Sequence, residues 1–212
     1  MTVAGSRANL IGTGLVGGSI GLALRHLGWH VSGTDADDER AERALERGAL
    51  DVVGLDPDAS ITFVAIPVQA VPDAVQRALD ETTGYVTDVG SVKGSIVDAV
   101  DDPRFVGGHP MAGSEQDGLD GADPNLFEGA VWVLTPTATT ADDAFAAVRS
   151  AVTSFGADVV ALSPERHDAL VAVVSHVPHL TAATLMHLAD ERSEEHRALL
   201  RLAAGGFRDM TR

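Results

Sequence analysis

The sequence contains no cysteine, a single lysine and few aromatic residues, and these shortages narrow the possible functions. Without cysteine, the 212-residue chain has no disulfide, no thiolate zinc site and no cysteine nucleophile. Its 15 basic and 31 acidic residues give a formal net charge of −16, which argues against binding to nucleic-acid backbones or anionic membranes. We find no stretch of about 18 apolar residues, so we predict no membrane span. These features predict a soluble cytoplasmic protein, in which an anionic ligand needs locally placed cations or helix N-termini.

Short β-rich runs alternate with helical patterns up to residue 161, which predicts a doubly wound, parallel α/β sheet. The expected strands are 9–11, 30–34, 61–66, 85–89, 131–134 and 158–161, and the expected helices are 19–27, 38–47, 71–79, 93–100 and 141–155. Beyond residue 161 only helical patterns remain, at 164–174, 179–190 and 193–204, with Pro178 as a kink or break and Gly205 as a stop. We therefore expect an α/β domain, 1–161, followed by an all-helical segment, 162–212.

A glycine-rich motif, Gly12-Thr13-Gly14-Leu15-Val16-Gly17, separates the first expected strand from the first helix. In this context the first glycine permits a tight turn, the second lets a pyrophosphate approach, and the third lets helix and strand pack closely. Asp35 ends the second strand, where a carboxylate binds ribose hydroxyls and repels a 2′-phosphate, although Arg40 is a nearby cation. The motif predicts a Rossmann-type dinucleotide site that prefers NAD to NADP.

Three more candidates follow, two at the ends of expected strands, where open α/β sheets bind ligands, and one in an expected loop. Pro67 follows the strand 61–66 and either contacts a cofactor or only ends the strand. Ser91, in the segment D-V-G-S-V-K, either caps a helix or faces an anionic substrate beside the only lysine, Lys93. His109 lies between glycine and proline, so we expect a loop histidine, either a general base or a partner of backbone groups.

Two motifs lie in the helical segment. In Ser175-His176-Val177-Pro178-His179, Pro178 disrupts the helical face and no third ligand is evident, so we predict no metal site. The segment G-G-F-R-D-M-T-R, ending at Arg212, either brings a guanidinium to a carboxylate or is a frayed chain end. The remaining histidines are expected to be surface or packing residues: His26, His30, His167, His187 and His196.

Together these segments resemble the prephenate/arogenate dehydrogenase family of tyrosine biosynthesis. The matching pieces, in the family's order, are G-T-G-L-V-G-G-S, D-V-G-S-V-K, G-G-H-P-M-A-G-S-E, S-H-V-P-H and G-F-R-D-M-T-R. The resemblance implies an NAD-dependent oxidative decarboxylation of prephenate to 4-hydroxyphenylpyruvate, or of arogenate to tyrosine. In that reaction a hydride leaves the carbinol carbon for NAD, and the ring carboxylate departs as CO2.

The resemblance also implies residue roles. His109 would accept the proton of the ring hydroxyl, Ser91 would orient that hydroxyl and His109, and Arg212 would bind a substrate carboxylate. Further candidate substrate contacts are His179, Lys93 and Glu115. The expected cofactor contacts are Gly12, Thr13, Gly14, Leu15, Val16, Gly17, Asp35, Pro67 and Ser91.

Family members usually continue past the T-R element with helices that build a dimer interface, whereas this sequence stops there, either as a shortened form or as a fragment. The resemblance implies a homodimer through the segment 162–212. Two alternatives remain open. Another small NAD(P)-dependent dehydrogenase of the same two-domain build would lack H-P-M-A-G-S-E, and many such enzymes place a catalytic lysine in the helical domain, where this chain has none. A non-catalytic NAD-binding protein would bind NAD without turnover and would be indifferent to His109→Asn.

Overall fold

The computed structural model describes residues 6–193 and 199–211. These residues form two compact units, of which the first ends at His167 and the second begins at Asp168. Helix α6 (Pro164–Val171) contains the boundary.

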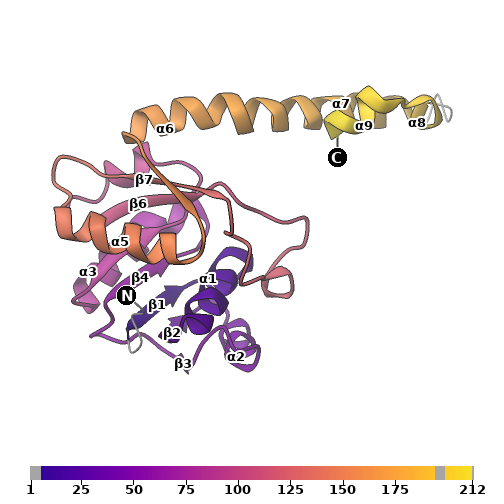
Figure 1. Cartoon of the computed structure of the whole chain (residues 1–212). Helices are drawn as coiled ribbons and strands as arrows, with labels where there is room; N and C mark the ends of the chain where they lie inside the picture. Colours follow the sequence, from indigo (N-terminus) through magenta and orange to yellow (C-terminus); the bar gives the residue numbers. More distant parts are fainter. Residues whose placement is uncertain (1–5, 194–198, 212) are drawn as a thin grey trace. The chain divides into compact units, whose positions relative to one another are not determined.

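The first unit is built on an eight-stranded sheet (Figure 1) in the spatial order β3-β2-β1-β4-β5-β6-β7-β8. Its strands are β1 (Arg7–Ile11), β2 (His30–Thr34), β3 (Val52–Val53), β4 (Ile61–Val64), β5 (Tyr85–Asp88), β6 (Phe105–Pro110), β7 (Val131–Thr135) and β8 (Asp158–Ala161). Since β2 lies on one side of β1 and β4 on the other, the strand order reverses there. Such a reversal opens a ligand crevice at the carboxyl ends of the two central strands, β1 and β4.

Helices cover both faces of this sheet, which confirms the predicted doubly wound architecture. They are α1 (Leu15–His26), α2 (Asp38–Glu46), α3 (Val71–Glu81), α4 (Gly94–Val97) and α5 (Asp142–Ser154), with single turns η1 (Val68–Ala70) and η2 (Leu119–Gly121). One core joins α1 and α5 to the sheet through residues such as Leu24, Val148 and Phe63. A second core joins α3 and α4 to the sheet through residues such as Leu79 and Ile96. The apolar faces of the helices therefore pack against the apolar strands in two hydrophobic cores.

Strand β6 corrects the expectation that His109 lies in a loop. His109 is part of β6 and pairs with Val133 of β7. The glycines that suggested a loop instead allow close strand packing, because a Cβ at Gly108 would lie 2.7 Å from the backbone oxygen of Asp88. We expected a wholly parallel sheet, but β6 and β7 pair antiparallel. A parallel pair needs a long crossover, usually a helix, whereas only the short turn η2 lies between these two strands.

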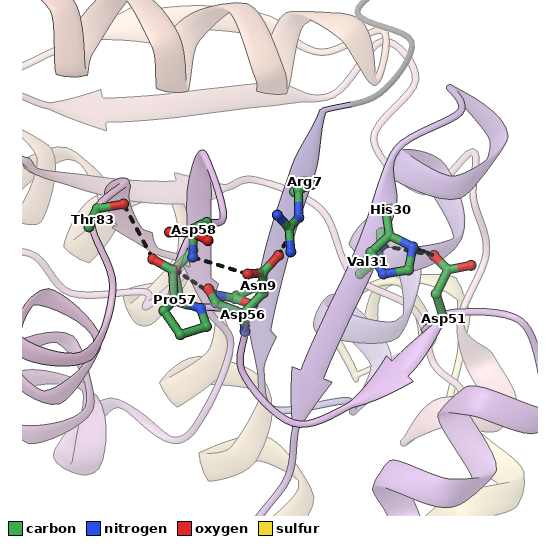
Figure 2. A network of polar contacts seen from close by, with 10 residues as sticks. Arg7, Asn9, His30, Val31, Asp51, Asp56, Pro57, Asp58 and Thr83 are labelled. Carbon is green, nitrogen blue, oxygen red and sulfur yellow. Dashed lines mark hydrogen bonds and ion pairs between the residues drawn. The ribbon is translucent and has the colours of Figure 1, made fainter.

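A polar network fixes the end of the sheet opposite the crevice (Figure 2). Asn9, buried on β1, donates from Nδ2 to the carbonyl oxygen of Asp56 and accepts the amide of Asp56 at Oδ1, both at 2.9 Å. Arg7 Nε lies 2.5 Å from Asp56 Oδ2. Thr83 donates to the carbonyl oxygen of Pro57 at 3.3 Å. These bonds anchor the connection into β4, so we assign the network a structural role.

The second unit is helical, as predicted, but Pro178 does not break it. Helix α6 passes through a π-helical turn, Ala172–His176, directly into α7 (Val177–Ser193). Pro178 has no amide hydrogen for the carbonyl of residue 174, and the wide turn lets the helix continue past that missing bond. Two short helices follow, α8 (Leu199–Leu202) and α9 (Gly205–Thr211).

Helix α9 corrects a second expectation, because Gly205 starts a helix rather than only ending one. The carbonyl oxygen of Ala204 accepts the amides of Phe207 at 3.1 Å and Arg208 at 3.2 Å. Thr211 donates its hydroxyl to the carbonyl oxygen of Phe207 at 2.8 Å. The described residues of this segment, up to Thr211, are therefore helical.

The stretch Pro164–Asp190 is long and apolar enough to cross a membrane, judged by length and composition alone. The stretch contains His176, Pro178 and His179, so it is not an uninterrupted run of about 18 apolar residues. Our prediction that the chain has no membrane span therefore stays a prediction. Its exposed apolar side chains include Val173, Val174, Val177 and Leu180. An apolar surface of this kind is also what a protein–protein interface requires.

Candidate active site

The glycine-rich loop joins β1 to α1 with the geometry that the motif predicts. Gly12 has a φ of +94°, and a Cβ there would lie 2.3 Å from the backbone oxygen of Ala65. A Cβ at Gly17 would lie 1.9 Å from the backbone oxygen of Gly12. A Cβ at Gly14, in contrast, would meet nothing within 4 Å. The loop is thus tightly packed beneath and open at Gly14, the position where a phosphate would approach.

The N-terminus of α1 is available to an anion. Gly14 is its N-cap residue, no side chain caps it, and the first turn contains no acidic residue. The first amide groups of a helix have no intrahelical acceptor, and the helix dipole adds a partial positive charge there. Together they make an anion site without any lysine or arginine.

Asp35 supports the loop from the end of β2. Its Oδ2 accepts the amide of Thr13 at 2.8 Å and the Thr13 hydroxyl at 3.1 Å. Its Oδ1 accepts the amide of Asp37 at 3.1 Å and lies 3.5 Å from a guanidinium nitrogen of Arg40. The carboxylate therefore fixes Thr13, which is fully buried, and its repulsion of a second anion is reduced by Arg40.

Two hollows meet at the glycine-rich loop. The first, of about 610 Å³, is lined on one side by Asp35, Arg40 and Arg77. The second, of about 390 Å³, is lined by Leu15, Val16, Ser91, His109 and Ala112 among others. Both include Gly14, Ala65, Ile66 and Pro67. The shared residues place the two hollows side by side, as the two halves of an elongated ligand with phosphates at its centre require. Arg77, on α3, was not predicted as a site residue. The helical pattern of α3 does not show which exposed arginine lies near Asp35, at the end of a strand distant in sequence.

Ser91 and His109 approach the second hollow from neighbouring strands. Ser91 follows β5 and is exposed, and His109 lies near the end of β6 and is half-buried. Since β5 and β6 are parallel, their carboxyl ends lie at the same edge of the sheet. A hydroxyl and an imidazole thus share one hollow with the open glycine, which is an arrangement suited to proton transfer beside a bound cofactor.

Lys93 is not placed as a substrate contact. Its side chain is fully buried, forms an ion pair with the equally buried Asp88, and donates from Nζ to the carbonyl oxygen of Gly108 at 2.8 Å. Asp88 also accepts the amide of Gly90 at 2.8 Å and that of Gly108 at 3.2 Å. We expected Lys93 to face the crevice. Its buried side chain instead connects the end of β5, at Asp88, with β6, at Gly108.

The other expected substrate contacts are Glu115, His179 and Arg212. Glu115 is exposed in the connection after β6, and it does not line either hollow. His179 lies in the second unit, on α7, with an exposed side chain. Arg212 lies outside the described residues.

Comparison with known proteins gives family matches over most of the chain. Residues 20–161 match the model of the prephenate dehydrogenase nucleotide-binding domain, and residues 163–212 match the model of the prephenate dehydrogenase dimerization domain. A prephenate dehydrogenase from Bacillus subtilis is 38% identical over 96% of this chain, and the alignment spans 59% of that relative. The chain thus covers little more than half the length of this relative.

Solved structures show the same similarity. A prephenate dehydrogenase from Aquifex aeolicus, in complex with hydroxyphenyl propionate and NAD+, is 31% identical with a TM-score of 0.89. That match covers 97% of this chain and 77% of the other. A Synechocystis arogenate dehydrogenase is 32% identical with a TM-score of 0.82, covering 97% of this chain and 78% of the other.

Proposed function

Because this chain belongs to the prephenate dehydrogenase family, we propose that it catalyses the NAD-dependent oxidative decarboxylation of prephenate or arogenate. The observation that carries the proposal is the second hollow, in which Ser91 and His109 share the walls with Gly14 of the glycine-rich loop. This arrangement supports the proposal, because the reaction needs a proton acceptor, an orienting hydroxyl and a cofactor site around a single space.

The residues of the two hollows fit NAD. The uncapped α1 N-terminus and the space at Gly14 suit the pyrophosphate, and Asp35 at the first hollow suits ribose hydroxyls. Pro67 lines both hollows, whereas Leu15, Val16 and Ser91 line the second. Bound NAD would supply the hydride acceptor. We propose NAD rather than NADP because the Asp35 carboxylate at the first hollow repels a 2′-phosphate. Arg40 and Arg77 line the same hollow and attract such a phosphate, so NADP is the necessary control.

In the proposed mechanism, His109 takes the proton of the ring hydroxyl and Ser91 orients that hydroxyl. Loss of the carbinol hydrogen and of the ring carboxylate as CO2 makes the ring aromatic. His109 then returns its proton to the phenolate oxygen, so that no net proton is released in forming 4-hydroxyphenylpyruvate. We propose that Arg212 binds a substrate carboxylate and that His179 and Glu115 are further substrate contacts.

The test follows reduced nicotinamide by absorbance, with the purified chain, NAD or NADP, and prephenate or arogenate in parallel. Turnover with NAD and either substrate supports the proposal and identifies the substrate. NAD binding without turnover on either substrate contradicts it and favours a non-catalytic NAD-binding protein. Turnover only on unrelated hydroxy acids or imines favours another dehydrogenase of the same build.

We expect Gly14→Val to weaken NAD binding while leaving the fold intact. A side chain there meets no protein atom but fills the space proposed for the pyrophosphate, and the φ of −70° lies outside the left-handed region that favours glycine. The dissociation constant for NAD, measured by calorimetry, should rise at least about tenfold, equivalent to about 1.4 kcal/mol. The unfolding temperature without NAD should stay unchanged. Unchanged NAD affinity in Gly14→Val would contradict the placement.

We further propose that the chain forms a homodimer through the helical unit, since that unit matches a dimerization-domain model and carries exposed apolar side chains. Leu180, 65% exposed on α7, is the probe. Leu180→Glu should raise the dimer dissociation constant more than about tenfold, because a symmetric interface buries the charge twice. Light scattering after size exclusion measures this. Leu45→Glu, an exposed apolar position on α2, serves as the matched control. Sedimentation of the wild-type chain with lipid vesicles would instead indicate a membrane-bound helix.

A further inference from the structure

A buried histidine contacts the candidate base directly. Nε2 of His167 lies 2.9 Å from Nδ1 of His109. The two rings meet edge to face, with centroids 5.1 Å apart and planes at 75°. His167 is fully buried, whereas His109 is half-buried at the second hollow. His167 was expected to be a surface or packing residue, and only the fold brings it to His109.

The contact is formed within the first unit by the β6-β7-β8 edge of the sheet. His109 lies on β6, β7 pairs with both β6 and β8, and α6 follows β8. His167 lies in the first turn of α6, where its amide donates to the carbonyl oxygen of Ser163 at 2.9 Å. Regular secondary structure therefore fixes both rings, which suits a contact that must hold its geometry.

A 2.9 Å separation between two ring nitrogens allows only one proton between them. If His109 carries it on Nδ1, its Nε2 has a lone pair and accepts a proton. If His167 donates instead, a neutral His109 carries its proton on Nε2 and is not a base there. When Nε2 of His109 accepts a proton, Nδ1–H must still donate, so only the first arrangement keeps the same hydrogen bond before and after the transfer.

We propose that His167 is a positioning residue that acts as the neutral acceptor for Nδ1–H of His109 and thereby keeps Nε2 free of a proton. It acts through His109 and does not touch the substrate. Burial suits this role, because a positive charge on the fully buried His167, beside a protonated His109, would be unfavourable. The mechanistic use of this tautomer rests on the proposed function, but the tautomer itself does not.

The tautomer is measured on the full chain, with ¹⁵N-labelled histidine and two-bond ¹H–¹⁵N correlation spectra at a pH where His109 is neutral. The His109 signals are those absent from the spectrum of His109→Asn. We expect the Nδ1–H tautomer. A predominant Nε2–H tautomer would overturn the proposal even if the enzyme is active. A chain that shows the Nδ1–H tautomer but no turnover on either substrate would support it while removing the proposed function.

Two variants separate positioning from packing. His167→Leu removes the acceptor at similar volume, and we expect His109 to lose its tautomer preference and kcat to fall about 10-fold to 100-fold, as when histidine-orienting partners of metal sites are removed. His167→Gln presents Oε1 as an acceptor and should keep the Nδ1–H tautomer and most of kcat. The KM for NAD should change in neither variant, and His26→Leu, at an exposed position, should match wild type.

Retention of the Nδ1–H tautomer in both variants, with stability lowered equally, would show a packing role and overturn the proposal. If His167→Leu does not fold, the wild-type and His167→Gln spectra decide the question.

Discussion

His109→Asn should lower kcat on the accepted substrate about a thousandfold, within the 10²-fold to 10⁴-fold range typical of a lost general base. Asparagine retains a polar side chain of similar reach but does not take up a proton at neutral pH. His109 lines the second hollow beside Ser91, while Asp35 and Arg77 line only the first. The affinity for NAD should therefore stay within about twofold of wild type if the loss is purely catalytic.

The measurement compares initial rates of reduced nicotinamide formation with NAD affinity from calorimetry. His26→Asn provides the matched control, because His26 is exposed and lies on α1, away from the Ser91–His109 hollow. A His109→Asn variant with unchanged kcat would exclude His109 as the base. A variant that loses NAD binding and turnover together would indicate instead that His109 supports the cofactor site.

Lys93→Met should be the most destabilising of the substitutions considered, by about 3–5 kcal/mol in the free energy of unfolding. The reason is that Asp88 would remain buried with its charge uncompensated. The same substitution should lower kcat. The Lys93–Asp88 pair is hydrogen-bonded to the backbone of Gly90 and Gly108. These glycines directly precede Ser91 and His109, so their displacement would move both side chains. Urea unfolding gives the free energy, and the midpoint should shift without a change in slope.

Arg7→Met is the matched control for this prediction. It removes the cation of the Arg7–Asp56 pair, in which Asp56 is buried but Arg7 is 48% exposed, so we expect a smaller loss than in Lys93→Met, where both partners are fully buried. The double variant Asp88→Asn/Lys93→Met removes both charges and should recover part of the stability lost in Lys93→Met. Equal losses in Lys93→Met and Arg7→Met would contradict the internal role of Lys93 and restore its candidacy as a substrate contact.

Local motifs determined the cofactor half of this site. The glycines at 12, 14 and 17 act within a single turn between β1 and α1, so their spacing in the sequence is also their spacing in space. Asp35 was predictable for a similar reason, since the end of a strand that pairs with β1 lies beside the loop that follows β1. The doubly wound sheet followed from the same alternation of short apolar runs and amphipathic helices.

Residues whose roles depend on burial were predicted less well. The sequence shows that Lys93 is the only lysine, but only the packing of α4 beneath β5 and β6 shows that it is internal. His109 was expected in a loop because glycine and proline suggest one, whereas the close approach of β6 to its neighbours requires those glycines within a strand.

The sequence by itself determined the fold class, the dinucleotide loop and the candidates His109 and Ser91, because each depends on a few consecutive residues and the regular geometry they adopt. Only the tertiary structure decided that His167 contacts His109 across 58 residues and that the glycine-rich loop, Ser91 and His109 line one hollow. Such contacts depend on which strands pair and in which direction, and strand pairing is a non-local property that no short segment encodes.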